Sequence, residues 1–256
     1  HSAWVATRTI DAIDKAARAD SPWFIAAGFF HPHPQLVVPQ RCLDLYDPTL
    51  LPEARRRAGE HDDKPAGYTP DYALAKGERA TDAYIRKFRH YYYAACSFID
   101  DQVGRIIKHL EQLGELDNTI IIFWSDHGEA AGDHGRFAKD CWNTDEIIRL
   151  PCLIRWPRAI PAGHTVDQLV ESIDLMPTLL EALGMQKPIG CDGRSQWPSV
   201  TGTAPGGREH ILVEIQLPPL ASGEHPAFLP RRALAPPSSI GEPGQDPQAR
   251  LRTALR

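Results

Sequence analysis

Two residues with metal-binding side chains follow a strongly apolar segment near the middle of the chain. The segment runs from Thr119 to Trp124, and after one serine come Asp126 and His127. Six apolar or β-branched residues in a row predict a strand buried on both faces, in a sheet that helices cover. In such sheets, ligands bind beyond the carboxyl ends of the strands. A carboxylate and an imidazole at this edge are therefore candidate metal ligands.

A loop without a metal is the alternative explanation for these two residues. In that case Asp126 caps the next helix and His127 is an ordinary polar side chain. Gly128 permits a sharp backbone turn under either interpretation. The surrounding sequence resembles a known family, as described below, and this resemblance favours the metal site over the loop without a metal.

Helical and strand patterns alternate along the chain, which predicts an α/β fold with a mainly parallel sheet flanked by helices. Strands are expected at 23–30, 119–125, 152–156 and 211–215. We expect the first three to lie in one sheet. The strongest helical pattern covers 82–113, where apolar residues recur every three or four positions and would pack on that sheet. Gly114 is the expected stop of this helix.

Weaker patterns complete the expected organisation. Shorter helices are predicted at 9–19 and 174–183, the second ending at Gly184. Residues 36–80 are rich in proline and charge and predict a long surface excursion. Beyond residue 217 prolines crowd together with few aliphatic residues, which predicts an irregular segment over 218–256.

Composition excludes several classes of protein. The chain has 256 residues, 42% of them hydrophobic and 24% charged, enough for one large globular domain. A net charge of −5 without a basic block gives no reason to expect nucleic-acid binding. No apolar run approaches the ~20 residues of a membrane span. Five cysteines without paired spacing indicate neither a disulfide framework nor a zinc site, so the compartment is undetermined.

Several segments, in the same order, resemble the sulfatase family within the alkaline-phosphatase-like group. They include Ser-Asp-His-Gly-Glu at 125–129 and Gly-Asp-His-Gly at 132–135. The others lie at 23–33, 92–105, 150–157, 172–180 and 192–195. The match extends from about Trp4 to about Ile215, and its best motifs look similar to the iduronate-sulfatase and choline-sulfatase branch. The resemblance implies an alkaline-phosphatase-like sulfatase core.

The resemblance also implies roles for particular residues. Asp126 and His127 correspond to metal-binding positions, and calcium (Ca²⁺) is the expected ion because it prefers oxygen ligands. A histidine ligand leaves Mn²⁺ or another transition metal as an alternative. Lys139 corresponds to the lysine that reaches a sulfate oxygen, although a lysine outside such a motif would be a solvated surface residue.

His33 corresponds to the family histidine near the leaving-group oxygen, where it would donate a hydrogen bond or a proton. His31 is its alternative, because the alignment over His31-Pro-His33 could shift by two residues. Asp133 and His134 are expected to stabilise their loop rather than to bind the metal. Asp100 and Asp101 receive no catalytic role.

The family's nucleophile motif is absent. Sulfatases use a formylglycine made from Cys or Ser in a Cys/Ser-x-Pro/Ala-x-Arg motif, and no cysteine of this chain lies in that pattern. We therefore expect a fragment, incomplete at both ends and inactive alone. Residues 1–217 would be the central and C-terminal part of the catalytic domain. Residues 218–256 would hold the irregular segment and the start of a C-terminal subdomain, in which residues 251–256 would begin a strand.

Three functions follow as hypotheses. The first is metal-dependent hydrolysis of a sulfate ester, either a small molecule or a sulfated glycan. The second is a phosphonate monoester hydrolase or phosphodiesterase of the same superfamily, whose metal and histidine motifs are similar. The third is a non-catalytic remnant of the fold. The substrate's identity, the nucleophile and the oligomeric state are not readable from these residues.

Overall fold

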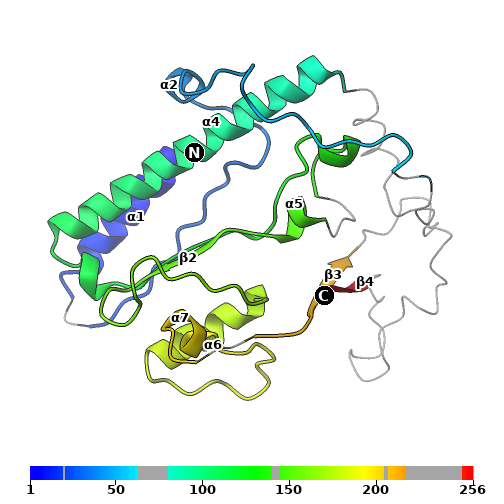
Figure 1. The fold of residues 1–256 in the computed structure, drawn as a ribbon. Coiled ribbons are helices and arrows are strands. Elements are labelled where there is room, and N and C mark those ends of the chain that lie inside the picture. The colour runs from blue at the N-terminus through cyan, green and yellow to red at the C-terminus, as the bar shows by residue number, and fades with distance from the viewer. Residues whose placement is uncertain are drawn as a thin grey trace, which may run out of the picture. The chain divides into compact units, whose positions relative to one another are not determined.

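The computed structural model describes residues 1–19, 21–60, 62, 80–139, 144–204, 207–216 and 250–255 (Figure 1). The chain forms two compact units. The first comprises His1–Glu60, Tyr72–Ile120 and Glu129–Ala138, and the second comprises His61–Asp71, Ile121–Gly128 and Lys139–Arg256. Because the chain passes between the units more than once, neighbouring motif residues belong to different units.

The first unit is helical, with α4 as its longest element. Its described helices are α1 (Ser2–Ala16), α2 (Gln40–Leu43), α4 (Asp82–Gln112) and the 3₁₀ turns η1 (Leu116–Asn118) and η2 (Asp133–Gly135). Both α1 and α2 pack against α4. The helix predicted at 82–113 is thus confirmed, and Gly114 ends it with a φ of +74°.

Local sequence signals explain where α4 begins. The hydroxyl of Thr81 accepts a hydrogen bond from the backbone N–H of Tyr84 at 3.2 Å, and Asp82 adds negative charge to the first turn. One apolar face then packs into the unit, and Ala94 and Phe98 of this face form a core cluster with Cys42 and Leu43 of α2. The period-3.6 pattern therefore predicted both the helix and its buried side.

The expected helix at 9–19 begins earlier and ends earlier than its pattern indicated. α1 starts at Ser2, and its buried residues include Ser2, Ala6, Thr9 and Ile13. Small and hydroxylated side chains therefore occupy much of the buried face, which weakens the apolar period that sequence patterns detect. A hydrogen bond of 2.8 Å from His109 Nε2 to Asp14 Oδ1 joins α1 to α4.

The prediction of a buried strand at 23–30 is wrong. This segment has no regular secondary structure, and Phe24 and Phe30 are 78% and 52% exposed. A strand exists through hydrogen bonds with a neighbouring strand, and among the described residues none forms a ladder with 23–30. An apolar segment therefore does not form a strand by itself, because it also needs a neighbouring strand as a hydrogen-bonding partner.

The surface excursion predicted for 36–80 is only partly correct. Within it, α2 buries Cys42 completely and leaves Leu43 only 8% exposed. Two apolar residues in a short helix are too few to produce a detectable period, although they complete the core against α4. Residues 61 and 63–79 lie outside the described part of the chain.

The described residues of the second unit form two small sheets. β1 (Ile121–Trp124) pairs with β2 (Cys152–Arg155), and β3 (Ile211–Gln216) pairs with β4 (Arg250–Leu255). Both pairs are antiparallel, with Ile121 opposite Arg155 in the first. The expectation of a mainly parallel sheet is therefore not met among the described strands. Apolar patterning predicts that a segment is buried but carries no information on the direction of its neighbour.

The strands predicted near 119–125, 152–156 and 211–215 are present, and the first two share a sheet as expected. All four residues of β1 are partly exposed, so burial on both faces is not observed. The expected packing of the helix 82–113 on this sheet stays a prediction, because that helix belongs to the other unit. β4 lies in the segment expected to be irregular, at the place where a strand was expected to begin, at residues 251–256. Residues 217–249 lie outside the described residues.

The helix expected at 174–183 is α6 (Leu175–Ala182), preceded by η3 (Ser172–Asp174) and followed by Gly184 with a φ of +68°. The other helices in the described part of this unit are α5 (Asp145–Ile148) and α7 (Trp197–Val200). Across the described ranges, no helix has the length and hydropathy of a membrane span.

A buried ionic cluster stabilises the region around η3. Asp174 is fully buried and receives hydrogen bonds from the backbone N–H groups of Glu171 and Arg194 at 3.0 and 2.7 Å. The guanidinium of Arg208 contacts Asp174 and, at 2.7 Å, Glu171. Glu171 also accepts from the backbone of Leu212 at 2.9 Å, which ties β3 to the cluster. A buried charge needs this degree of pairing to be tolerated.

Candidate functional site

Three of the four predicted site residues lie in the second unit, around the end of β1. Asp126 is the second residue beyond Trp124, the last residue of β1. Its side chain is 86% exposed. The carboxylate accepts a hydrogen bond from the backbone N–H of His127 at 3.0 Å. Asp126 is thus at the carboxyl end of the strand, where the sequence predicted it.

The hydrogen bonds of His127 indicate the tautomer of its ring. Nδ1 lies 2.8 Å from the carbonyl oxygen of Gly128, and a carbonyl can only accept, so Nδ1 carries the proton. The neutral ring then has its lone pair on Nε2. This nitrogen lies 3.6 Å from Oδ2 of Asp126. A backbone carbonyl that fixes the ring in this way is typical of metal-binding histidines.

Lys139 reaches the same nitrogen of the same ring. Its Nζ donates to Nε2 of His127 at 2.8 Å, across twelve residues of sequence. Asp126, His127 and Lys139 therefore form one cluster with one negative charge, one neutral acceptor and one positive charge. The structure brings these three predicted residues together.

Gly128 explains how the backbone can pass so close to α5. A Cβ added there would lie 1.8 Å from the carbonyl oxygen of Glu146 and 3.1 Å from Cα of Ile147. The N–H of Gly128 donates to the carbonyl of Ile147 at 2.8 Å. A side chain would therefore push His127 away from its observed position, and only glycine permits this approach.

The alternative of a helix cap at Asp126 is not realised. The next regular element is η2, which has Gly132 at its N-cap position, and α5 has Thr144. The carboxylate of Asp126 instead points to its own neighbour, His127. The Asp-His pair therefore has no capping function that would explain it.

His33 and its alternative, His31, both lie in the first unit and differ in their surroundings. His31 is held by Ser2 Oγ on Nδ1 at 2.7 Å and by the carbonyl of Val37 on Nε2 at 3.1 Å. Its ring also meets Phe98 edge-on at 5.8 Å. Burial lowers the pKa of His31, with an opposing effect of its bond to Val37. His31 therefore acts as part of the fold.

His33 is exposed, and its Nδ1 donates to the carbonyl of Pro34 at 2.6 Å. The ring packs against Phe30 with 4.9 Å between centroids. Because Nδ1 is engaged with this carbonyl, a proton for a substrate would have to come from Nε2 of the cationic ring, in which both nitrogens are donors. Of the two histidines, His33 has the exposure that a proton donor to a substrate requires.

Two residues that the sequence did not single out support the loop between His127 and Lys139: Glu129 within the loop and Arg89 on α4. Glu129 Oε1 accepts from the backbone N–H groups of Ala131 at 3.2 Å and Ala138 at 2.5 Å. Arg89 of α4 contacts this loop at Ala131 and Asp133. One signal existed for Arg89: it lies four residues after Ile85, so a charged residue interrupts the apolar face of the predicted helix.

Asp133 and His134 have the loop-stabilising surroundings that were expected. Asp133 Oδ1 pairs with Arg89 and accepts from the backbone N–H of Arg55 at 2.6 Å. The ring of His134 lies 3.3 Å from Glu60, and its backbone N–H donates to the carbonyl of Arg55 at 2.7 Å. Both residues thus connect the loop to residues 55–60.

Asp126 and His127 fit a divalent ion as two donors of a larger set. An exposed carboxylate and an oriented imidazole nitrogen lie 3.6 Å apart, and each is a known ligand type. Ca²⁺ takes six to eight oxygen ligands, so two donors are not a complete site. In the part of the chain that the structure describes, no group of three or more His, Cys, Asp or Glu could hold a metal.

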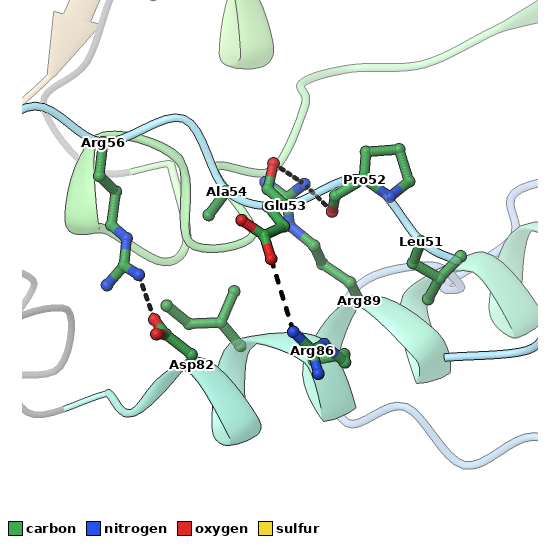
Figure 2. A pocket seen from close by; sticks show the side chains of 9 residues that line it. Leu51, Pro52, Glu53, Ala54, Arg56, Asp82, Arg86 and Arg89 are labelled. Carbon is green, nitrogen blue, oxygen red and sulfur yellow. Dashed lines mark hydrogen bonds and ion pairs between the residues drawn. The ribbon is translucent and has the colours of Figure 1, made fainter. Parts of the chain in front are cut away.

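A small cavity of about 60 Å³ lies elsewhere, in the first unit. It opens between residues 51–56 and the N-terminal turns of α4 (Figure 2). Ion pairs of Arg56 with Asp82 and of Arg86 with Glu53 border it. None of its lining residues is a predicted site residue, and it is too small for a sugar or aryl substrate.

Comparisons with known proteins agree with the resemblance. The family model described as Sulfatase matches residues 3–185. The multifunctional alkaline phosphatase superfamily protein PehA of Trinickia caryophylli is 36% identical over 197 residues, which are 71% of this chain and 38% of PehA. The N-acetylglucosamine-6-O-sulfatase of Bacteroides thetaiotaomicron is 37% identical over 123 residues, which are 48% of this chain and 22% of that enzyme.

Among solved structures, the phosphonate monoester hydrolase of Agrobacterium radiobacter is similar with a TM-score of 0.76 and 28% identity. The likeness covers 87% of this chain and 46% of that one. The chain thus spans less than half the length of these relatives. The matched residues include β1, Asp126, His127 and Lys139. On the extent of this match, the chain belongs to the sulfatase family.

Proposed function

We propose that this chain supplies part of the active site of a sulfuric ester hydrolase. In this proposal Asp126 and His127 bind a divalent metal ion, and Lys139 donates a hydrogen bond to an oxygen of the sulfate group. The carrying observation is the cluster itself: His127 Nε2 lies 3.6 Å from Asp126 and 2.8 Å from Lys139 Nζ. The family match supports the type of reaction.

Charge explains why this set of groups suits the reaction. Hydrolysis of a sulfate ester concentrates negative charge on the oxygens around sulfur, and fixed positive groups stabilise that charge. A bound divalent ion would supply Lewis-acid stabilisation of these oxygens. The ammonium of Lys139 would add a hydrogen-bonding cation, and Asp126 would keep the metal ion in place. Each proposed role thus matches the functional group of the side chain to which it is assigned.

The chemistry of the two donors favours some divalent ions over others. Asp126 offers a hard oxygen, which suits Ca²⁺, and we propose Ca²⁺ as the ion. The nitrogen of His127 is a poorer ligand for Ca²⁺, so Mn²⁺ or another transition metal is the alternative. The contact between Lys139 and His127 Nε2 has a direct consequence: the ammonium must leave this nitrogen when a metal binds it.

His33 is proposed to hydrogen-bond the leaving-group oxygen and to donate a proton to it. Its exposure supports this role, and the engagement of both ring nitrogens of His31 in the fold argues against the alternative. No residue of this chain has the formylglycine motif, so these residues bind, orient and protonate but do not attack the sulfur. We therefore expect the 256-residue chain alone to be inactive.

The substrate is proposed to be a sulfate ester, either a small molecule or a sulfated glycan. The name of the N-acetylglucosamine-6-O-sulfatase relative supports a sulfated sugar. A phosphonate monoester hydrolase is the second candidate, favoured by the similar structure from Agrobacterium radiobacter. Both reactions place negative charge on the same set of oxygens, so the cluster serves either.

The test compares substrates. The product of the complete gene should be assayed on an aryl sulfate, an aryl phosphonate monoester and an aryl phosphodiester, each with Ca²⁺ or Mn²⁺. The proposal predicts the highest kcat/KM on the sulfate. Preference for the phosphonate would replace the first candidate by the second. Robust turnover by the 256-residue chain itself would show that its nucleophile has been overlooked.

A further inference from the structure

We propose that Phe30 is a specificity-determining residue, whose exposed ring binds the leaving group of the ester when that group carries a ring of its own. The chemistry that Phe30 recognises is an apolar ring face, offered by an aryl group or by the C–H face of a sugar. This inference rests on the proposed function, because it takes His33 as the residue that contacts the leaving-group oxygen. All residues that carry the inference belong to the first unit.

A tight turn holds the rings of Phe30 and His33 next to each other. The backbone N–H of His33 donates to the carbonyl of Phe30 at 3.0 Å, which closes the turn. The two rings pack with 4.9 Å between their centroids and 51° between their planes. Because the rings are tilted and not stacked flat, His33 leaves part of the ring face of Phe30 uncovered.

The middle of this turn is anchored in the fold. His31 lies between Phe30 and His33 in the sequence, and its two ring nitrogens contact Ser2 Oγ at 2.7 Å and the carbonyl of Val37 at 3.1 Å. These contacts fix the backbone on which both neighbouring rings stand. A ring that is held in place before a ligand arrives loses little conformational freedom on binding, which lowers the cost of association.

Phe30 keeps about half of its surface exposed although two rings contact it. His1 meets its ring edge-on at 6.3 Å and His33 lies at 4.9 Å, yet Phe30 remains 52% exposed. Gly28, two residues earlier, is also exposed, and a Cβ there would meet nothing within 4 Å. The described residues thus leave room beside the ring for a ligand. Aromatic side chains commonly line ligand sites, because they offer a large apolar area in a fixed shape.

The role proposed for His33 places the leaving group near Phe30. Nδ1 of His33 contacts the carbonyl of Pro34 at 2.6 Å, so the contact with the leaving-group oxygen falls to Nε2. That oxygen would lie about 2.6–3.2 Å from Nε2. Rings attract one another at centroid distances of about 4.5–7 Å, and the ring of Phe30 is 4.9 Å from that of His33. A ring attached to the oxygen is therefore within reach of Phe30, whereas a short linear group offers far less apolar area.

The first measurement needs no turnover. The complete gene product is titrated into 4-methylumbelliferone, the leaving group of a fluorogenic aryl ester, and fluorescence anisotropy gives the Kd. Phe30→Ala should raise the Kd by about threefold to tenfold, the range expected when one aromatic contact is lost. Phe30→Tyr keeps the ring and should bind within about twofold of wild type. Phe24→Ala, the matched control, removes a 78% exposed phenylalanine of the same segment and should also change the Kd by less than about twofold.

The second measurement compares esters with and without a ring in the leaving group. KM and kcat are determined for 4-nitrophenyl sulfate, N-acetylglucosamine 6-sulfate and ethyl sulfate. Phe30→Ala should raise KM by about threefold to tenfold for a ring-bearing ester and leave kcat within about twofold, because the contact binds the ground state and the transition state alike. The KM of ethyl sulfate should stay within about twofold of wild type. The ester whose KM rises shows whether the ring is that of an aryl group or of a sugar.

Circular dichroism verifies that each variant is folded, and Phe30→Leu, which keeps much of the volume but not the ring, decides if Phe30→Ala does not fold. A raised Kd in a protein that does not hydrolyse sulfate esters would support the role of Phe30 and reject the proposed function. Turnover of sulfate esters with an unchanged Kd and unchanged KM values in the folded variant would overturn the role of Phe30 and leave the proposed function intact. An equal rise in KM for the ring-bearing esters and for ethyl sulfate would also overturn it.

Discussion

Replacing Gly128 by alanine tests whether close backbone packing holds His127 in place. The added Cβ would lie 1.8 Å from the carbonyl oxygen of Glu146 and 2.8 Å from its carbonyl carbon. Ordinary contacts of a Cβ begin at 3.4 Å, and both obstacles are backbone atoms that cannot rotate away. The segment containing Gly128 must therefore move away from α5, and His127 must move with it.

The expected loss of stability in Gly128→Ala has two contributions. Overpacking of this kind typically costs about 1–3 kcal/mol. Separation of the segments also breaks the hydrogen bond from Gly128 to the carbonyl of Ile147, now 2.8 Å long, at about 0.5–1.5 kcal/mol. We expect Gly128→Ala to lower the free energy of unfolding by about 2–4 kcal/mol, a large part of a typical domain's stability.

Urea unfolding followed by tryptophan fluorescence measures this change, with Trp124 two positions before Asp126 as a nearby reporter. Gly104→Ala is the matched control, because nothing lies within 4 Å of a Cβ at this exposed position of α4. Alanine favours a helix over glycine by about 1 kcal/mol, so the control should be neutral or stabilising. A Gly128→Ala variant within about 0.5 kcal/mol of wild type would refute the packing argument.

Two further predictions concern stability. Asp174→Ala should lower the free energy of unfolding by about 3–5 kcal/mol in urea titrations, because it leaves the guanidinium of Arg208, whose side chain is only 12% exposed, without this carboxylate. A loss below about 1 kcal/mol would show that the cluster contributes little to stability. For His31, burial lowers the folded pKa below the ordinary 6.5, so the unfolded chain binds the proton more readily. The stability contributed by His31 should therefore be complete above pH 6.5 and decline as the pH falls through that value. The variant His31→Asn should show less of this decline when unfolding is measured at pH 7.5 and 5.5. An identical pH dependence of stability in both proteins would contradict this assignment.

The helical part of the fold was predictable because its signals are local. In α4 the apolar period, the cap at Thr81 and the stop at Gly114 all lie within the helix or beside it. Strand direction was not predictable, because the apolar runs at β1 and β2 suit parallel and antiparallel neighbours equally. The segment 23–30 failed for a related reason: its patterning described a strand, but no described residue pairs with it.

In the candidate site, too, the features set by nearby sequence were predictable and those set by tertiary contacts were not. Asp126, His127 and Lys139 share one short motif, and the cluster they form was expected from it. Arg89 lies 37 residues before Asp126 in the sequence, and its contact with the loop depends on tertiary structure. A sequence pattern therefore found the residues that carry the chemistry but not the residue that holds their loop.

Asp126 is proposed to hold a metal ion on which turnover of a sulfate ester depends, with Lys139 acting on the sulfate. The most direct measurement determines metal content and kcat on an aryl sulfate in the same preparations of the complete gene product. Asp126→Ala should lose both the metal and the activity. Lys139→Ala should keep the metal and lose about 10²–10³-fold in kcat, as when a single positioned donor is removed, whereas the exposed-lysine control Lys108→Ala should match wild type. An Asp126→Ala enzyme that retains its metal and hydrolyses the sulfate at the wild-type rate would contradict the metal-binding role of Asp126.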